Sequence, residues 1–485
     1  MTTTTPLPVF QSARSLILEQ FKDFLNADLE AMQLMDLLAA EEEIGAFSQE
    51  LARALLNEFV TVRSTQVRQQ PPTCECGQVM TVHRMTSWPH NTLYGVIQVP
   101  DPYFYCRACR SSARPLHRVL GTEHEAYSMG LQEATVDLVA DESCGSAVDK
   151  LERHHPGVHL DRTAALRLLH RHGQAAREFL DVRMAEAQQR ALLPAAEQPE
   201  GVAEMEVEFD GGMIPVGTFE LIEVPEGQAP ELTKGRKLPK KKRKTYWEEV
   251  KLGLVQIPGQ LDRLYSVRPT AGLDVSFEDL FSLACLSGWT PQTKVRGIAD
   301  GARHIRPRMQ EAFNDCDFMF ILDRPHAREH LSKSGEALQS LTEQPAQQWA
   351  DAALAKLEQG HADAVVKELH DAWVSSGDDE ASRNDVLRLE ANYFDRNSDA
   401  VAYATYRENG WSTASSEVES GHRHVVQQRV KIPGAWWRPD QVDHILALRM
   451  LKANDLWEAY WKYRRTRWRQ DAALLRARPV LRKAA

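Results

Sequence analysis

Hydrophobic and polar positions change their period several times along this chain, and each change indicates a different kind of element. Between residues 25 and 64, apolar residues recur at three- and four-residue steps, which predicts an amphipathic helix. The apolar stripe of this helix comprises Ile44, Phe47, Leu51 and Leu55. The breakers QQPPTCECG end the pattern, and TLYGVIQVPDPYFY then reads as strand. From Ser128 to about Gly173 the period is helical again, in three short segments.

A period of two begins at residue 202, where VAEMEVEFDGG alternates apolar side chains with acids and predicts a strand. Two more strand candidates follow, EVKLGLVQI and RLYSVRPT. After them come a helix in SFEDLFSLACLSG, a strand in TKVRGIAD and a strand in FMFILD. The order β-β-β-α-β-α-β is typical of an RNase H-like α/β domain. Residues 335–408 interrupt it with a polar, alanine-rich helical pattern, and ASSEVESGHRHVVQQRV then predicts the next helix of the domain.

The composition is that of an ordinary globular chain, with 43% hydrophobic and 26% charged residues in 485 positions, too many for one core. Neither a secretory signal nor an apolar run that spans a bilayer is visible, so we expect a cytoplasmic protein that is not bound to a membrane. The net charge of −10 argues against a nucleic-acid partner, but the charges are uneven. KGRKLPKKKRK, near residue 240, and the tail from Lys462 are strongly basic. Such blocks are often merely solvated, although YWKYRRTRWR interleaves aromatic residues with arginine, as suits phosphate contact and stacking.

Four of the seven cysteines form two short pairs, CECG and CRAC, on either side of the predicted hairpin. This arrangement is typical of a zinc ribbon, in which thiolates complete a closed, structural Cys₄ site. The predicted Zn²⁺ ligands are Cys74, Cys76, Cys106 and Cys109. The alternative is four unrelated thiols, and the first pair is tighter than the usual C-x-x-C.

The last helix of the 128–173 segment, HLDRTAALRLLHRHG, has Asp161 as a good N-cap. It exposes Arg162, Thr163, Arg167 and Arg171. Three helices whose last presents basic side chains are similar to a helix-turn-helix reader of DNA, with plain helical packing as the alternative.

Three acids stand where an RNase H-like fold would use them. Asp210 ends the first strand of the domain, Asp300 ends the fourth, and Glu419 lies on the helix after the helical insertion. Because the first and fourth strands of that fold are neighbours, these carboxylates are predicted to converge on two Mg²⁺ or Mn²⁺ ions. Each acid also has a plain reading: Asp210 and Asp300 precede glycine in turn-like pairs, and Glu417 competes with Glu419.

The stretch FILDRPHAREHL contains H-x-x-E-H, the inverted signature of a zinc metalloprotease. His326 and His330 would bind the metal, and Glu329 would be the general base. A zinc protease also needs a further carboxylate ligand, and nothing in the sequence marks one.

Much of the chain, roughly residues 70 to 460 apart from the 222–246 insertion and the variable helical region, resembles the ISKra-type bacterial insertion-sequence transposases, members of the mutator-like DDE group. The resemblance runs through the cysteine pairs followed by RPLHRVLG, through EFDGG, IADGARHI and ILDRPHAREHL, and through EVES-GHRHVVQQRVKIPGAWW. It implies Asp210, Asp300 and Glu419 as the catalytic triad, with Asp323 and His326 as support residues. Two departures are the tight CECG and the sequence SSEVES, where such proteins more often carry glycines before the glutamate.

The resemblance implies a transposase that binds double-stranded DNA, at terminal inverted repeats and target, as a homodimer or larger assembly near the bacterial nucleoid. A domesticated DNA-binding protein without catalysis is the alternative from another class. The predicted DNA contacts are Arg162, Arg167, Arg171, Lys241, Lys242, Arg464, Arg465, Arg467 and Arg469.

We therefore predict a multi-domain α+β protein with an RNase H-like catalytic core. The predicted segments are an N-terminal helical region (1–66), a zinc ribbon (67–120), a helix-turn-helix-like region (121–190), the first part of the core (200–334, with a basic insertion at 222–246), a helical insertion (335–408), the last part of the core (409–460) and a basic tail (461–485).

Overall fold

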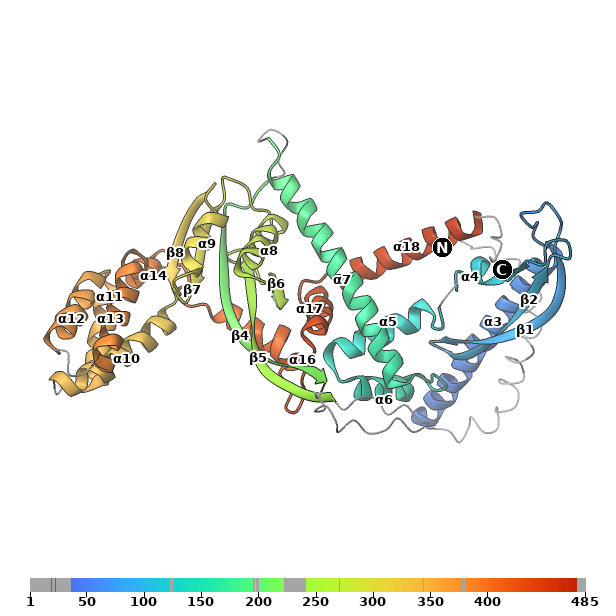
Figure 1. Ribbon diagram of the computed structural model, residues 1–485, viewed down its shortest axis with the longest axis horizontal. Helices are drawn as coiled ribbons and strands as arrows, with labels where there is room; N and C mark the ends of the chain where they lie inside the picture. The colour runs from blue at the N-terminus through green and yellow to red at the C-terminus, as the bar shows by residue number, and fades with distance from the viewer. Residues whose placement is uncertain are drawn as a thin grey trace, which may run out of the picture. The chain divides into compact units, whose positions relative to one another are not determined.

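The computed structural model divides the chain into two compact units, which are described separately (Figure 1). Unit 1 comprises Met1–Leu169 and Glu458–Ala485, and unit 2 comprises His170–Trp457. The structure describes residues 36–122, 125–194, 200–221, 241–269, 271–342, 344–376 and 381–477, together with Glu19, Lys22 and Glu197. Most of the predicted basic insertion (222–240), most of the N-terminal region and the end of the tail lie outside these residues. Among the described helices, none has the length and apolar character to cross a membrane.

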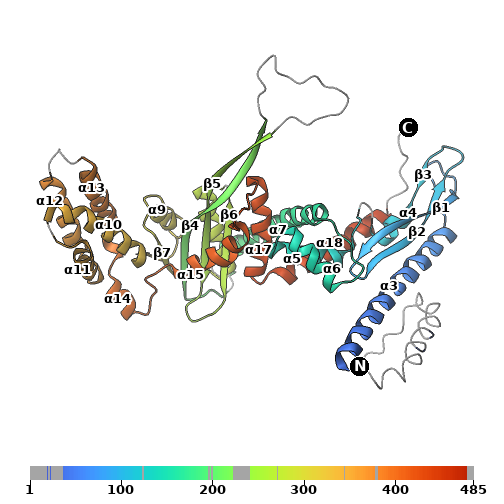
Figure 2. The same ribbon diagram turned by 90° about the horizontal axis from the view of Figure 1, so that it is seen from below.

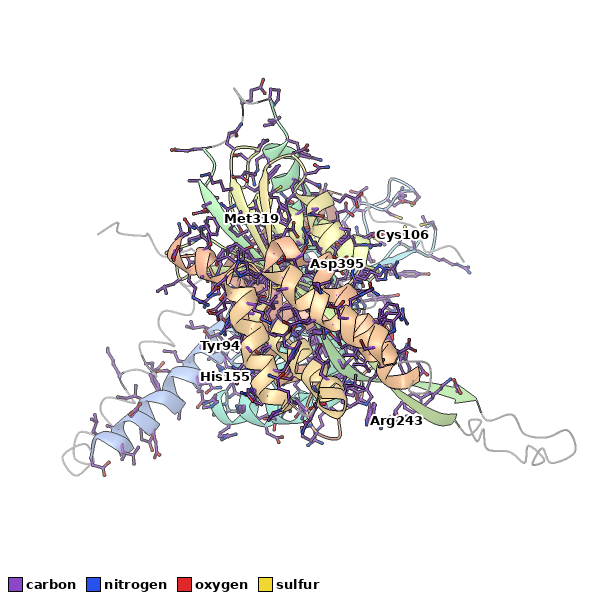
Figure 3. The ribbon with its side chains drawn as sticks, turned by 90° about the vertical axis from the view of Figure 1, so that its left-hand side faces the viewer. Tyr94, Cys106, His155, Arg243, Met319 and Asp395 are labelled. Atoms are coloured by element: carbon purple, nitrogen blue, oxygen red, sulfur yellow. The ribbon has the colours of Figure 1, made fainter. Side chains whose placement is uncertain are left out.

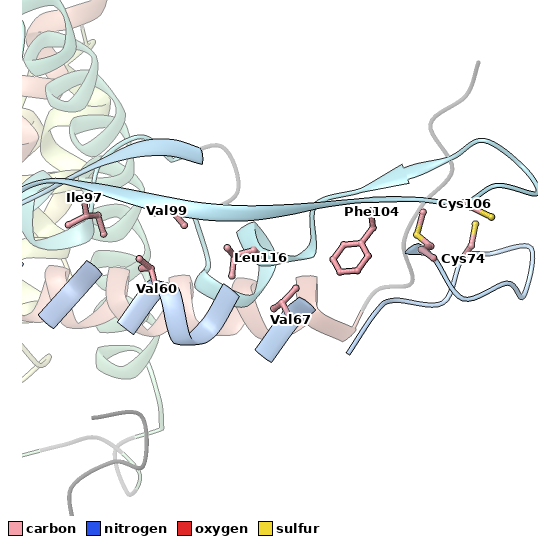
Figure 4. Packing of buried hydrophobic residues seen from close by; sticks show 9 residues of the cluster. Val60, Val67, Cys74, Ile97, Val99, Phe104, Cys106 and Leu116 are labelled. Atoms are coloured by element: carbon pink, nitrogen blue, oxygen red, sulfur yellow. The ribbon is translucent and has the colours of Figure 1, made fainter. Parts of the chain in front are cut away.

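Unit 1 begins with one long helix packed on a small antiparallel sheet. Helix α3 (Leu37–Gln69) is followed by β1 (Thr81–Thr92), β2 (Gly95–Tyr105) and the short β3 (Ser112–Ala113), in the order β1-β2-β3. Their common core, drawn in Figure 4, contains Val60, Val67, Ile97, Val99, Phe104 and Leu116.

The apolar stripe predicted for the first helix is not its buried face. Ile44 is 51% exposed, whereas the buried side chains are Val60, Ser64 and Val67, one helical turn apart. Beyond Val60 the helix is covered by the sheet, so tertiary contact rather than the local apolar pattern decides which residues are buried.

The remaining helices of unit 1 are α4 (Pro115–Leu120), α5 (Met129–Asp141), α6 (Cys144–His154), the beginning of α7 (Arg162–Ala191) and most of α18 (Trp457–Ala477). The predicted N-cap at Asp161 is confirmed, because its Oδ1 accepts the Ala164 amide at 2.8 Å. The prediction that this helix ends near Gly173 is wrong. A Cβ at Gly173 would lie 2.5 Å from the carbonyl oxygen of His444, so the glycine serves close packing inside the helix and not termination.

Unit 2 is built on a five-stranded mixed sheet in the order β6-β5-β4-β7-β8. Its elements along the chain are β4 (Glu204–Leu221), β5 (Lys241–Gln256), β6 (Arg263–Pro269), α8 (Leu273–Leu286), β7 (Lys294–Ala299), α9 (Ile305–Ala312) and β8 (Asp317–Leu322). The predicted order β-β-β-α-β-α-β and the pairing of the first strand with the fourth are both confirmed. β4 runs parallel to β7 and antiparallel to β5.

The β4–β5 hairpin is longer than its neighbours. β7 pairs only with Glu204–Phe209 of β4, and β6 pairs only with Val250–Gln256 of β5. The two strands therefore continue beyond the rest of the sheet as a two-stranded projection, which Figure 2 shows. Residues 241–246, predicted as part of an insertion, are the first residues of β5.

A set of helices follows β8, as predicted from the alanine-rich segment. They are α10 (Arg324–Thr342), α11 (Ala346–Glu358), α12 (Ala362–Ser375), α13 (Ala381–Arg396), η3 (Ser398–Ala400) and α14 (Tyr403–Glu408). The chain enters and leaves this helical module at one point, because the Arg324 amide donates to the Thr413 carbonyl at 2.8 Å.

The last part of unit 2 is helical. The helix predicted over 414–430 consists of α15 (Ser416–Gly421), a π-helical turn η4 (His422–Gln427) and α16 (Gln428–Val430). α17 (Pro439–Ala453) follows and packs on β6.

Candidate active site and metal centre

The four paired cysteines of unit 1 lie together. Cys74 and Cys76 precede β1, Cys106 and Cys109 follow β2, and all four sulfur atoms lie within 4.8 Å of one another. The Cys74–Cys109 and Cys76–Cys106 sulfur pairs are 3.3 and 3.5 Å apart. Tetrahedral Zn–S bonds of about 2.3 Å require sulfur separations of about 3.8 Å, so small adjustments fit a metal ion here. Figure 4 shows Cys74 and Cys106 beside the core of the unit.

Tight backbone turns bring each cysteine pair into position. The Gly77 amide donates to the Cys74 carbonyl at 2.8 Å, and Gly77 has a φ of +82°. The Arg110 amide donates to the Cys106 carbonyl at 2.9 Å, with Arg110 also left-handed at 62°. The turn at Gly77 allows both cysteines of the short C-x-C pair to contribute a thiol to the cluster.

Ser111 prepares two of these thiols for metal. Its Oγ lies 3.0 Å from the sulfur atoms of both Cys74 and Cys109. The hydrogen bond from Ser111 lowers the pKa of Cys109 to about 6 and is also the largest cause of a lowered Cys74 pKa. Because the thiolate is the metal ligand, this favours binding near neutral pH.

In unit 2, Asp210 and Asp300 lie at the same edge of the sheet. Phe209 pairs with Ala299 at the end of the parallel β4–β7 ladder, so the next residue of each strand segment is one of the two aspartates. The prediction that Asp300 directly follows its strand is confirmed, but the prediction that Asp210 ends its strand is wrong, because β4 continues to Leu221 through its pairing with β5. Asp300 is held by the Ala302 amide, which donates to its Oδ1 at 2.9 Å. Burial raises the pKa of Asp210, and the negative charge of Asp300 raises it further. A cation between them would relieve this repulsion.

His326 and Asp323 form a hydrogen-bonded pair beside these aspartates. His326 Nδ1 donates to Asp323 Oδ2 at 2.6 Å, and the His326 amide donates to the same oxygen at 2.9 Å. The bond to Asp323, with attraction from Asp210 and Asp300, raises the pKa of His326 to about 9. The imidazole is therefore a cation at neutral pH, facing an acidic cluster.

His422, at the start of the π-helical turn, contacts Asp210 from another side. Its Nε2 lies 3.2 Å from the Asp210 carbonyl oxygen and 3.8 Å from Oδ2. The ring is buried directly over Gly212, where a Cβ would lie 2.8 Å from Nδ1. Gly212, the second glycine of EFDGG, thus leaves room for this histidine. Sequence analysis did not identify His422 as a neighbour of Asp210, although its motif GHRH was noted.

Three buried carboxylates hold the segment that leads into α15. Asp323 accepts the Ser415 amide at 2.6 Å, and Glu208 accepts the Val418 amide at 2.7 Å. Glu206 accepts both the amide and the hydroxyl of Ser412, at 3.2 and 3.1 Å. We call these three acids the carboxylate clamp.

Glu208 is fully buried and differs from the other two acids of the clamp in its hydrogen bonding. Its Oε1 has no hydrogen-bond partner among the described residues, and burial raises its pKa to about 8. The acidic face of the strand predicted at 202 is thus not a solvent face. The only signal of this burial in the sequence was the alternation of acidic and apolar residues. That alternation does not reveal which part of the chain covers the acidic face.

Glu419 lies at the edge of the cluster. Its carboxylate is bound to Arg423 at 2.7 Å and is 63% exposed, while Glu417 points elsewhere and pairs with Arg263 at 3.0 Å. Among the described residues, only the four cysteines form a group of three or more ligands within 4.8 Å of one another. The structure therefore brings Asp210 and Asp300 to one edge of the sheet but does not gather all three predicted acids around one point.

The H-x-x-E-H residues do not form a zinc site among the described residues. His326 is bound to Asp323, and His330 is bound to Glu390 at 2.6 Å. Glu329 is exposed. The two histidines thus serve different carboxylates, which gives the metalloprotease reading no geometric support.

The predicted DNA contacts are distributed over several elements. Arg162, Arg167 and Arg171 are exposed on α7, and Lys241 and Lys242 begin β5. Arg464, Arg465, Arg467 and Arg469 lie on α18, where Arg465 pairs with Glu133. The aromatic residues between them are partly used for packing: Trp461 is fully buried, and Trp468 Nε1 donates to the Gly121 carbonyl at 3.0 Å.

Comparisons with known proteins do not assign a function to these sites. No protein-family model matches the chain, and no curated protein or solved structure matches it either.

Proposed function

We propose that this chain is a DDE-type DNA transposase that cuts and joins DNA strands at the ends of an insertion sequence. The observation that carries the proposal is the placement of Asp210, where the pairing of β4 with β7 stops, beside Asp300, which directly follows β7. The strand order β6-β5-β4-β7-β8, with β5 antiparallel to β4, supports an RNase H-like core.

The two aspartates supply hard oxygen ligands of the kind that Mg²⁺ and Mn²⁺ prefer. Such ions, when bound, activate the attacking oxygen and stabilise the leaving oxygen in phosphoryl transfer. Glu419 is one helical turn from Arg423, and its exposed carboxylate is the proposed third ligand once it leaves that arginine. His326, held as a cation by Asp323, supplies positive charge where phosphate would approach.

The other parts of the chain supply DNA contacts in this proposal. The cysteine cluster holds Zn²⁺ and stabilises the small sheet, while the exposed arginines of α7 bind element ends. Two ends must be joined, so we expect a homodimer or larger assembly on DNA.

The test is Mg²⁺-dependent cleavage of DNA that carries the element ends. Asp210→Ala and Asp300→Ala should each lower the cleavage rate by at least about 10³-fold, because each removes a metal ligand from the reacting centre. Glu419→Ala should do the same, whereas Glu417→Ala and Glu329→Ala should retain most activity. Full cleavage by Asp210→Ala, with DNA binding unchanged, would contradict the proposal.

A second candidate is a DNA-binding protein that has lost catalysis. The observation that favours it is the engagement of Glu419 with Arg423 instead of the aspartates. It predicts tight binding to element ends and no cleavage by the unmodified protein with either Mg²⁺ or Mn²⁺.

A further inference from the structure

On the projecting part of the β4–β5 hairpin, the exposed ring of Trp247 lies beside the half-buried ring of Trp436, and a cation flanks each ring. Trp247 is 53% exposed, and its ring lies 6.3 Å from that of Trp436, at 62°. Lys431 Nζ lies 5.7 Å from the centre of the Trp247 ring, and Arg243 Cζ lies 5.4 Å from that of Trp436. Figure 3 shows Arg243 on this projection. We call these four residues the tryptophan platform.

The backbone holds the platform in place from two directions. Trp247 is paired with Pro215 in the β4–β5 ladder. The segment that carries Trp436 is attached to the same ladder, because the Gly217 amide donates to the Trp437 carbonyl at 2.8 Å. The Trp437 indole donates to the Val430 carbonyl at 2.7 Å, which anchors the other end of that segment. These hydrogen bonds fix the backbone that carries Trp247 and Trp436.

The cations of the platform remain available for an anionic ligand. Elsewhere on the hairpin, Lys244 pairs with Glu220 at 3.4 Å and Lys251 pairs with Glu249 at 2.7 Å. Neither Arg243 nor Lys431 has a carboxylate within 4.0 Å in the part of the chain that the structure describes. Large exposed aromatic rings beside unneutralised cations suit a ligand with both flat apolar faces and negative charge.

We infer that the tryptophan platform binds an unpaired stretch of DNA, with a base stacked on Trp247 and the phosphates near Arg243 and Lys431. Bases expose their faces only where they are unpaired, and stacking on aromatic side chains does not depend on sequence. A purely apolar protein partner would gain nothing from the two cations. The inference rests on the proposed function for its ligand: Asp210 is paired with Leu252, five positions along β5 from Trp247, or about 17 Å away. Because five is an odd number of positions, the two side chains lie on opposite faces of the hairpin, and a strand opened near Asp210 would pass around the edge of the hairpin to reach the platform.

The test is the binding of a short, labelled single-stranded oligonucleotide, measured by fluorescence anisotropy without Mg²⁺. Trp247→Ala should weaken binding by about 5- to 150-fold, the loss expected for one stacked base. Tyr246→Ala is a matched control, because Tyr246 is the adjacent aromatic residue, is 40% exposed and points to the opposite face of the strand. It should change affinity by less than about twofold.

A second oligonucleotide, with the same phosphates but abasic positions, separates stacking from charge. The unmodified protein should bind it more weakly than the normal strand, and Trp247→Ala should bind both equally. Lys431→Ala should instead reduce the salt dependence of binding to both, by about 0.7 in the log–log slope.

Three results would overturn the inference: unchanged binding by Trp247→Ala, an equal loss for normal and abasic strands, or lost self-association in place of lost DNA binding. Because the measurement needs no cleavage, it does not depend on the catalytic proposal. Asp210→Ala should bind the strand normally, so failure of the platform and failure of the active site are distinguishable.

Discussion

Two glycines determine how closely the π-helical turn approaches the sheet. A Cβ at Gly421 would lie 2.7 Å from Tyr265 and 2.8 Å from Leu252, and a Cβ at Gly212 would meet the His422 ring. The motifs EFDGG and GHRH therefore pack against each other. Small side chains are required on both sides for His422 to reach Asp210.

Gly212→Ala should lower the free energy of unfolding of unit 2 by about 1–3 kcal/mol, because the buried imidazole has no space to move. Gly130→Ala is the control, since nothing lies within 4 Å of a Cβ there and helix α5 should gain about 0.5–1 kcal/mol. Urea unfolding measures both. Equal stability of the two variants would contradict the packing role of Gly212.

His326 should make stability depend on pH. Its pKa rises from 6.5 to about 9 on folding, so its contribution is complete below pH 6.5 and is lost as the pH rises through about 9. For a partly exposed ring, we expect His326→Gln to cost about 1 kcal/mol at pH 6.5 and almost nothing at pH 9.5. Urea unfolding at both pH values measures the difference, with exposed His361→Gln as control. A constant difference would show that His326 contributes packing only.

At the scale of elements, α15 is positioned by strands rather than by its own sequence. The carboxylate clamp receives amides at three-residue steps, from Ser412, Ser415 and Val418. This fixes the start of the helix that carries Glu419.

Glu208→Ala should free the Val418 amide and cost about 1–3 kcal/mol. Glu208→Gln keeps an acceptor of the same shape and should be nearly as stable as the unmodified protein. If the proposed function holds, the Mg²⁺ concentration for half-maximal cleavage should rise for the alanine variant alone, because the start of the helix that carries Glu419 is no longer fixed. An equal rise for both variants would mean that the charge matters rather than the hydrogen bond.

The small sheet of unit 1 should depend on metal. Unmodified protein should hold about one Zn²⁺ per chain, and Cys109→Ser should release it and destabilise β1 and β2. Cys316→Ser is the control, since that thiol lies in unit 2 and donates to the Phe313 carbonyl. Folded protein without zinc by elemental analysis would contradict this prediction.

Local signals predicted much of this architecture. Alternation marked the strands of unit 2, and the cysteine spacing marked the cluster, because each pattern lies within a few residues. The carboxylate clamp could not be predicted, since its partners are 206 and 210 positions apart for Glu206 and Glu208. The extent of α7 was missed for a similar reason: Gly173 resembles a helix end until His444 is seen beside it.

At the scale of the whole molecule, the tail is part of unit 1 and not a free basic extension. Tyr460 and Trp461 are fully buried, Trp468 packs on Gly121, and Arg465 pairs with Glu133. Removing residues 462–485 should therefore lower the free energy of unfolding of unit 1 by at least about 3 kcal/mol, the cost of losing a packed tryptophan. Calorimetry should show one shifted and one unshifted transition. Two unshifted transitions would instead indicate that the tail does not pack on unit 1.

A contact with DNA through the tail needs a gentler test than truncation. Lys462, Arg467 and Arg469 are exposed on α18. Replacing Arg467 and Arg469 with alanine should keep the fold and flatten the salt dependence of duplex binding by about 0.9 per lost phosphate contact. An unchanged slope would mean that these arginines do not contact phosphates and serve solubility instead.

The hydrogen bond from Arg324 to Thr413 has a consequence for how this chain tolerates change in length. Because the helical module begins and ends at one place, the sheet is constrained only by the two ends of the module. The number of residues between those ends does not affect the sheet. Doubling a closed loop costs only about 0.6 kcal/mol of chain entropy. Insertions or deletions within this module should therefore leave Asp323 and Ser415 joined at its base.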